Sequence, residues 1–168
     1  MKKIMIIALL GLLVSCSPGM HPEYGKNVET VKRFLELQAN ESNIDAQMSM
    51  VAEELEWQPA FHGVVPIGKE AFKAYLLNWQ NEMEAVMYTP SNYLPGVLVE
   101  TGLSDGSVRS YGEWTGIHTA TGKKWAFISY HTWDFKEGKI ISGGDYFDAG
   151  GLMAFLQASA AVVEVSEE

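Results

Sequence analysis

The chain has 168 residues, a length typical of a single domain with one hydrophobic core, and its formal charge is −9. An acidic chain without clustered lysine and arginine does not suit a nucleic-acid partner, so we expect none. The sequence contains no phosphate-binding loop, dinucleotide-binding fingerprint or G-x-S-x-G motif. We therefore expect no cofactor.

The first fifteen residues have the pattern of a secretory signal. Lys2 and Lys3 precede an uncharged apolar run, residues 4–14, which is too short to span a bilayer permanently. The run closes with L-V-S-C, which resembles the lipobox of bacterial lipoproteins, and Cys16 is the only cysteine. We expect residues 1–15 to be removed and Cys16 to anchor the protein in a membrane of the bacterial envelope. An ordinary signal peptide is the alternative.

Processing at Cys16 changes what can stabilise the rest of the chain. Removal of the two lysines lowers the formal charge from −9 to −11. If Cys16 is lipidated, the mature protein would have no free thiol and no disulfide, so we expect its stability to come from packing. Residues 16–26 are the expected tether, and residues 27–157 the expected domain, followed by a polar tail over residues 158–168.

The first half of this domain has the patterns of three helices and one strand. The expected elements are a first helix, a helix over residues 44–50, a strand over residues 51–58 and a helix over residues 68–84. Asn27 is the expected N-cap of the first helix, and Thr30 is the weaker alternative. Ser42 or Asn43 is the expected cap of the second helix.

The second half has the patterns of an antiparallel sheet. The expected elements are a strand over residues 93–101, a hairpin turn over residues 104–107, a three-strand meander over residues 108–148 and a short helix over residues 152–156. The pair Pro95 and Gly96 suggests a bulge or an edge position. Helices come early and the sheet late, so the fold class is α+β.

Several short motifs in this order resemble the SnoaL-like group of the nuclear transport factor 2-like superfamily. They are V-P-I-G-K-E-A-F over residues 65–72, W-T-G-I-H-T-A-T-G-K over residues 114–123, F-K-E-G-K-I-I over residues 135–141 and Y-F-D over residues 146–148. The resemblance implies a curved antiparallel sheet wrapped by N-terminal helices into a cone with an internal pocket, a cystatin-like α+β roll. It also implies a homodimer. The group includes cyclases, isomerases and dehydratases, so fold alone does not settle function.

Turn positions predict which side chains share a face of the meander. Two-residue turns at residues 121–122 and 137–138 would place His131 opposite Gly112 and Gly144, with open space around it. The face of His131 would then carry Trp114, Phe127, Ser129, His131, Trp133 and Tyr146. The other face would carry Tyr111, Glu113, Tyr130 and Asp145. A slip of one residue exchanges the faces.

His131 is the first candidate for chemistry. It lies where the resemblance to the cyclases implies their catalytic aspartate, and a histidine can act as acid or base near neutral pH. The alternative is a buried histidine that is hydrogen-bonded within the sheet. Glu113, Tyr130 and Asp145 could form an acid pair around a phenol, or a polar rim or dimer face.

The remaining candidates concern a pocket. Trp57, Trp79 and Trp114 are candidate pocket walls, although large aromatic residues also form cores. His62 lies in the loop before the long helix, either at a pocket mouth or simply in solvent. The spacing of His62, His118 and His131 matches no zinc motif, so no metal is expected.

Three hypotheses follow from these patterns. The first is an envelope lipoprotein whose pocket binds a small, largely apolar or polycyclic molecule. The second is a cofactor-free isomerase, cyclase or dehydratase that uses His131. The third is a protein-interaction module that uses the outer face of the sheet, as a homodimer or within an envelope complex.

Overall fold

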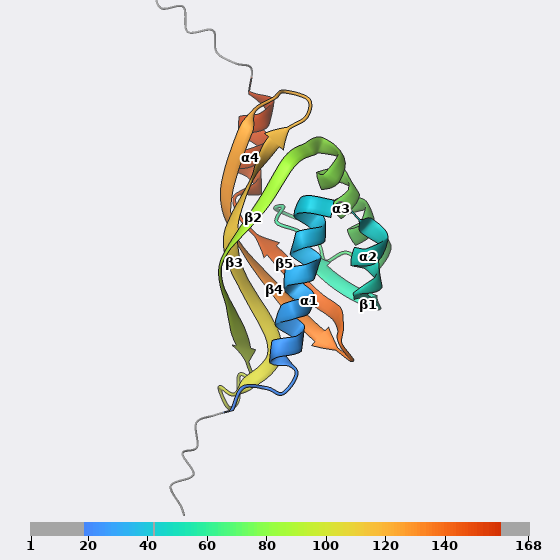
Figure 1. The fold of residues 1–168 in the computed structure, drawn as a ribbon, viewed down its shortest axis with the longest axis vertical. Helices are drawn as coiled ribbons and strands as arrows, with labels where there is room; N and C mark the ends of the chain where they lie inside the picture. The colour runs from blue at the N-terminus through green and yellow to red at the C-terminus, as the bar shows by residue number, and fades with distance from the viewer. Residues whose placement is uncertain (1–18, 42, 159–168) are drawn as a thin grey trace, which may run out of the picture.

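The computed structural model describes residues 19–41 and 43–158 (Figure 1). The elements are α1 (Tyr24–Glu36), the π-helical turn η1 (Leu37–Glu41), α2 (Ile44–Ser49), β1 (Val51–Gln58), α3 (Lys69–Glu82), β2 (Met83–Val97), β3 (Ser104–His118), β4 (Lys124–Lys136), β5 (Lys139–Tyr146) and α4 (Ala149–Gln157). This is the predicted order with one π-helical turn added. The predicted signal and Cys16 lie outside the described residues. Within the described part, no helix is long and apolar enough to cross a membrane.

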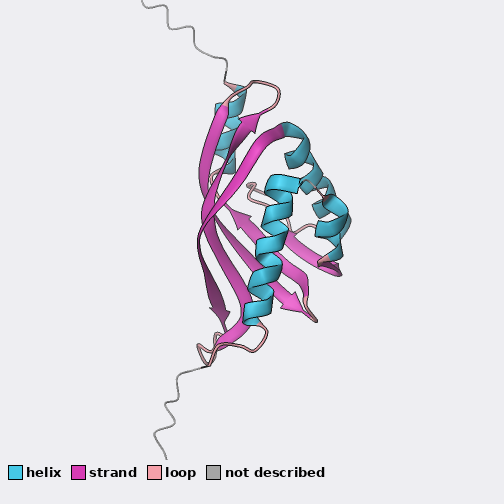
Figure 2. Cartoon of the chain, viewed as in Figure 1, coloured by secondary structure: helices cyan, strands magenta, loops and turns pink. Residues whose placement is uncertain are grey.

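The five strands form one curved sheet in the order β1-β5-β4-β3-β2, which confirms the α+β class. β2, β3, β4 and β5 pair antiparallel, whereas β1 pairs parallel with β5 at one edge. The helices α1, α2 and α3 lie on one side of the sheet, and α3 leads from β1 at one edge to β2 at the other (Figures 1 and 2). The helices therefore cover one face, which we call the inner face.

An aromatic cluster fills the space between these helices and the inner face. Trp57 of β1 lies 4.7 Å from Phe72 of α3 and 4.9 Å from Trp133 of β4, measured between ring centroids. Phe34 of α1 lies 5.3 Å from Trp133. All four side chains are almost completely buried, and each contributes about 1.5–3 kcal/mol or more by leaving water.

The start of α1 differs from the prediction. The helix begins at Tyr24, so Asn27 lies inside it rather than at its cap. The Asn27 side chain is buried and donates from Nδ2 to the carbonyl of Gly106 at 2.9 Å, which links α1 to β3. The second helix begins as predicted, because the Asn43 side chain accepts from the backbone N–H of Ala46.

The β2–β3 hairpin also differs from the prediction. β2 begins at Met83, directly after α3, and residues 104–107 belong to β3 rather than to a turn. Met83 is already extended, so the chain leaves α3 without a loop, and Ala85 adopts a φ of 48° where the register of β2 shifts between Glu84 and Met87. The predicted irregularity at Pro95 is confirmed, because the register shifts between Pro95 and Val97 in this edge strand.

The predicted register of β3 and β4 is wrong by two residues. Ile117 pairs with Lys124, so the loop is longer than the assumed two-residue turn, and His131 lies opposite Ser110 rather than Gly112. A shift of two residues preserves the faces. Trp114, Phe127, His131 and Trp133 therefore share the inner face, as predicted.

The predicted register of β4 and β5 holds only beside the turn. Phe135 pairs with Ile140 as expected, but an irregularity between Asp134 and Phe135 then shifts the pairing by one residue. His131 consequently lies opposite Asp145 rather than Gly144. This shift moves Asp145 to the inner face, and the predicted faces of Asp145 and Tyr146 are both wrong.

Candidate functional site

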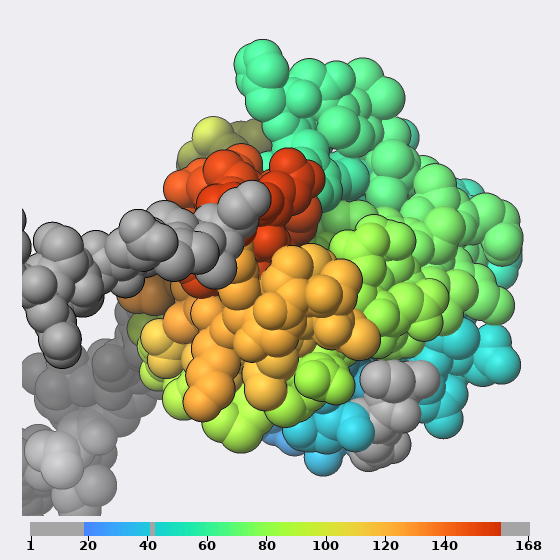
Figure 3. Space-filling model, turned by 90° about the horizontal axis from the view of Figure 1, so that it is seen from above, coloured from blue at the N-terminus to red at the C-terminus, as the bar shows by residue number. Residues whose placement is uncertain are grey.

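A cavity of about 630 Å³ lies between the helices and the inner face. Its walls are mainly aromatic and include Phe34, Trp57, Phe72, Tyr75, Trp79, Trp114, Trp125, Phe127, Trp133 and Phe147. All five tryptophans of the chain line it. The start of β2 and the turn η1 contact each other and form most of the part of the wall that is not aromatic. Both lie at the end of the molecule that Figure 3 views.

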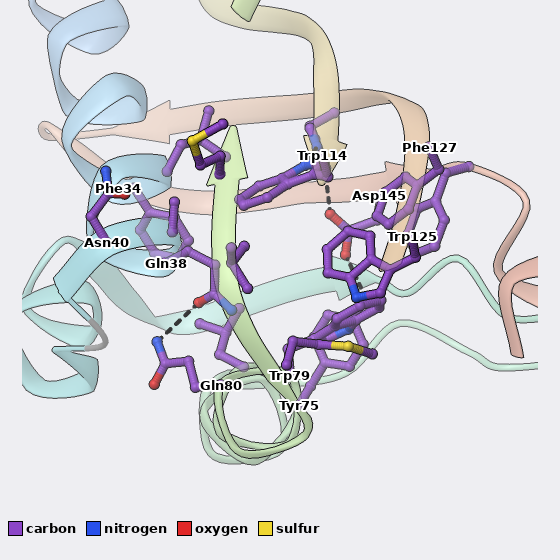
Figure 4. A pocket seen from close by; sticks show the side chains of 18 of the residues that line it. Phe34, Gln38, Asn40, Tyr75, Trp79, Gln80, Trp114, Trp125, Phe127 and Asp145 are labelled. Carbon is purple, nitrogen blue, oxygen red and sulfur yellow. Dashed lines mark hydrogen bonds and ion pairs between the residues drawn. The ribbon is translucent and has the colours of Figure 1, made fainter. Parts of the chain in front are cut away.

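His131 and Asp145 form a pair on the inner face, and both line the cavity. Figure 4 shows Asp145 among the aromatic side chains of the wall. The Nδ1 atom of His131 lies 2.7 Å from Oδ1 of Asp145. Both residues are buried, with 4% and 8% of their surface exposed. The register shift before Phe135 creates this pair, because without it a glycine would lie opposite the histidine.

The neighbouring Trp114 fixes the tautomer of His131. The indole Nε1 of Trp114 lies 3.1 Å from Nε2 of His131. An indole N–H can only donate, so Nε2 accepts and carries no proton. The imidazole proton is then on Nδ1, which donates it to Asp145. His131 is therefore a neutral imidazole whose two nitrogens both have partners.

The second oxygen of Asp145 is also occupied. Oδ2 accepts from the indole Nε1 of Trp57 and from the hydroxyl of Tyr75, both at 3.0 Å. Burial, and then the nearby Asp145 carboxylate, raise the pKa of Tyr75 well above its usual value, so Tyr75 stays a phenol. Three donors thus hold one buried carboxylate, and they fix the rings that form the cavity wall.

The other predicted site residues divide between the two faces. Trp57, Trp79, Trp114 and Trp133 line the cavity. Ser129 is buried on the inner side and donates to the carbonyl of Gly112, but it is not a lining residue.

His62 is exposed in the loop before α3 and does not line the cavity. His62, His118 and His131 do not come together. Within the described residues, no three His, Cys, Asp or Glu side chains gather as a metal site requires.

The predicted grouping of Glu113, Tyr130 and Asp145 is split by the sheet. Asp145 faces the cavity, whereas Tyr130 pairs with Tyr146 and Tyr111 on the opposite, outer face. The rings of Tyr111 and Tyr130 stack with centroids 4.7 Å apart, and those of Tyr130 and Tyr146 lie 5.3 Å apart. The outer face therefore carries a row of tyrosines, with Glu113 exposed near it.

Sequence reasoning missed two polar features of the cavity. The helical spacing of residues 72–79 indicates that Tyr75 lies on the buried face of α3, where a phenol needs an acceptor, but it does not identify Asp145 as that acceptor. Sequence reasoning also missed the amides of Gln38 and Gln80, which line the cavity and bond to each other. The signal was a glutamine at helical spacing on a buried helix face, where a polar side chain needs partners.

Comparisons with known proteins support the fold. No protein-family model and no curated protein sequence matches the chain. Among solved structures, a protein of Jannaschia sp. CCS1 named for SnoaL-like polyketide cyclases has a TM-score of 0.70 and 16% identity, covering 84% of this chain and 98% of that protein.

Two other similar structures were solved with bound molecules. A protein of Catenulispora acidiphila DSM 44928 with a ketosteroid isomerase-like fold, in complex with trimethylamine, has a TM-score of 0.61 and 15% identity over 75% of this chain and 90% of its own. TerC, co-crystallised with polyporic acid, has a TM-score of 0.62 and 15% identity over 79% and 98%. The chain therefore has the nuclear transport factor 2-like fold, which it shares with SnoaL-like polyketide cyclases.

Proposed function

We propose that the cavity binds a small, largely apolar molecule. The observation that carries this proposal is a space of about 630 Å³ walled by ten aromatic side chains, a size typical of small-molecule sites. Its buried ionisable groups, His131 and Asp145, are paired with protein partners, whereas the buried indole Nε1 of Trp125 has none among the described residues. The ligand is therefore held mainly by apolar contact. The complexes of similar folds with trimethylamine and polyporic acid support the proposal.

Because every tryptophan lines the cavity, their emission reports on what enters it. N-phenylnaphthylamine is an uncharged apolar fluorophore that absorbs tryptophan emission, so we expect it to bind and quench that emission.

Ala39→Phe, in the η1 wall of the cavity, should weaken this binding at least tenfold because the added ring fills the cavity. Ala74→Phe, on the exposed side of α3, is the control and should bind as the wild type does. Equal binding by all three proteins would refute the proposal.

A second candidate function is proton transfer by His131, favoured by the 2.7 Å contact with Asp145. A substrate that displaces the Trp114 N–H would meet the free lone pair of Nε2. His131 could then take a proton from a carbon next to a carbonyl and return it to another atom, while Asp145 stabilises the imidazolium. This is the chemistry of an isomerase.

Deuterium exchange tests this candidate. Tetralone is a neutral bicyclic ketone with exchangeable α-protons, and mass spectrometry measures its deuterium uptake in heavy water. The wild type should accelerate exchange, and His131→Gln should abolish the acceleration while N-phenylnaphthylamine still binds. Acceleration that survives in His131→Gln would remove His131 from the mechanism.

The outer face favours a homodimer, in which a second copy would cover the tyrosine row. Ile128 lies on this face with 78% of its surface exposed, and Tyr146 is 48% exposed. Such a patch favours self-association. Sedimentation velocity should show a dimer that Ile128→Glu converts to monomers. A monomeric wild type would contradict this proposal.

For localisation, we propose a lipid anchor at Cys16 in the bacterial envelope. The support is the charged start, the apolar run and the L-V-S-C motif of residues 1–16. Metabolic labelling with a clickable palmitate analogue should label the wild type and not Cys16→Ser. A soluble, unlabelled wild type would refute the anchor.

A further inference from the structure

Three glutamine amides form a closed cluster beside the cavity. Gln47 of α2 is completely buried, whereas Gln38 of η1 and Gln80 of α3 line the cavity. Gln47 Nε2 donates to Gln38 Oε1 at 2.9 Å, and Gln80 Nε2 donates to Gln38 Oε1 at 3.1 Å and to Gln47 Oε1 at 2.9 Å. We call these residues the amide cluster.

A backbone carbonyl fixes the orientation of every amide in the cluster. Gln47 Nε2 also donates to the carbonyl oxygen of Phe34 at 3.3 Å. A flipped Gln47 would place its own oxygen against that carbonyl, so its nitrogen must face Phe34. Because Gln47 Nε2 donates, the Gln38 atom beside it must be the oxygen Oε1. Gln38 Oε1 and Gln47 Oε1 both accept, so the Gln80 atom beside them must be the nitrogen Nε2. The hydrogen-bond network thus determines which atoms are donors.

This orientation leaves the amide nitrogen of Gln38 free on the cavity side, in addition to the indole Nε1 of Trp125, which is unpaired within the described part of the chain. Gln38 Oε1 accepts two hydrogen bonds, but Gln38 Nε2 has no partner among the described residues. Figure 4 shows the Gln38 amide inward of Gln80. His131 and Asp145, by contrast, are saturated by each other, Trp114, Trp57 and Tyr75.

We propose that Gln38 anchors an oxygen acceptor of the bound molecule. The ligand class is then a neutral, mostly apolar molecule that carries a carbonyl-type oxygen at one end. The walls disfavour a negative charge, because within the described residues no lysine or arginine lines the cavity, whereas Glu84 and Asp145 do. An anion would be repelled there. A cationic ammonium group has no lone pair with which to accept from Gln38 Nε2. This inference rests on the proposed apolar binding and adds the polar group to it.

Fluorene, fluorenone and fluorenol test this inference, because they share one tricyclic frame and differ only in carrying CH₂, C=O or CHOH at one carbon. Their affinities are measured by displacement of N-phenylnaphthylamine. One hydrogen bond to Gln38 predicts that fluorenone binds the wild type about fivefold more tightly than fluorene does. Equal affinities for fluorenone and fluorene would overturn the inference.

Gln38→Glu is the sharpest variant. It keeps an oxygen for Gln47 and Gln80 but replaces the free donor by an acceptor. We expect it to lose the preference for fluorenone and to favour fluorenol, whose hydroxyl can donate. A Gln38→Glu protein that still prefers fluorenone would overturn the inference. A structural defect in this variant would weaken binding of all three compounds, but it would not reverse the preference from fluorenone to fluorenol.

Two further measurements complete the test. Gln38→Met also lacks the donor and serves as the test if Gln38→Glu fails to fold. It should show equal affinities for fluorenone and fluorene; a retained preference for fluorenone would again overturn the inference. Gln157→Glu makes the same change on the exposed side of α4 and should keep the wild-type preference. If the wild type binds none of the three compounds, the proposed apolar binding itself fails, which is a different outcome from equal binding.

Discussion

Replacement of Asp145 by asparagine tests the polar pair at the centre of the site. In the wild type, Oδ1 accepts from His131, and Oδ2 accepts from Trp57 and Tyr75. The amide of asparagine has one acceptor and one donor end. If the NH₂ group takes the position of Oδ2, it faces the two donors Trp57 and Tyr75. If it takes the position of Oδ1, it faces the N–H of His131.

A change of tautomer does not resolve this conflict. If His131 moved its proton to Nε2, that N–H would face the indole N–H of Trp114, which lies 3.1 Å away. At least one pair of buried donors therefore remains opposed. Each unsatisfied buried donor costs about 1–3 kcal/mol, offset in part because the asparagine carries no buried charge. We expect Asp145→Asn to lower the free energy of unfolding by about 2–3 kcal/mol.

Urea unfolding followed by circular dichroism measures this loss. The matched control is Asp134→Asn, because the Asp134 carboxylate also accepts from two side chains, Arg109 and Ser142, but is half-exposed on the outer face. The control should lose less than about 1 kcal/mol. If Asp145→Asn unfolds within about 0.5 kcal/mol of the wild type, the donors around Asp145 are not arranged as described.

Three further predictions concern stability. Burial raises the pKa of Tyr75, so above pH ~10 the unfolded chain loses a proton that the folded chain keeps, and the free energy of unfolding falls as the pH rises. Tyr75→Phe should reduce the slope of the free energy of unfolding against pH by up to about 1.4 kcal/mol per pH unit, measured by urea titrations; an unchanged slope contradicts this. Gly143→Ala should cost about 1–3 kcal/mol or more because its methyl would overlap the backbone carbonyl of Thr132 and lie 2.5 Å from the Trp57 ring. Gly25→Ala, with open space in α1, should be neutral or stabilising; equal effects of the two substitutions in thermal unfolding would refute this packing. Asn43→Ala removes a helix cap and should cost about 1 kcal/mol in the same assay; no loss would exclude the cap.

The order of the elements was predictable because each has a local signal. Helical spacing, turn residues and the alternation in residues 51–58 are properties of short segments, and β1 has the predicted bounds. The faces of β3 and β4 were also correct, because an error of two residues in register leaves every side chain on its own side.

The site was harder to predict because it depends on a single irregularity in pairing. The shift between Asp134 and Phe135 exchanges the faces of Asp145 and Tyr146, and no turn residue marks it in the sequence. The amide cluster joins α3 to η1 and α2, which precede it in the chain with β1 between them. Only the packing of the helices brings Gln38, Gln47 and Gln80 together.

These features give the cavity two different polar regions. At His131 and Asp145 the hydrogen bonds are internal and hold the walls in place. At Gln38 the amide nitrogen remains free to donate to a bound molecule. The aromatic surface between them supplies most of the contact area, which suits a rigid, flat, neutral ligand.

A crystal structure of the protein grown with fluorenone would test the central claim most directly. Our account predicts that the tricyclic frame lies in the cavity between the aromatic walls, with its oxygen within hydrogen-bond distance of Gln38 Nε2. A cavity that stays empty at a saturating concentration of fluorenone, or a molecule bound only on the outer face, would contradict the account.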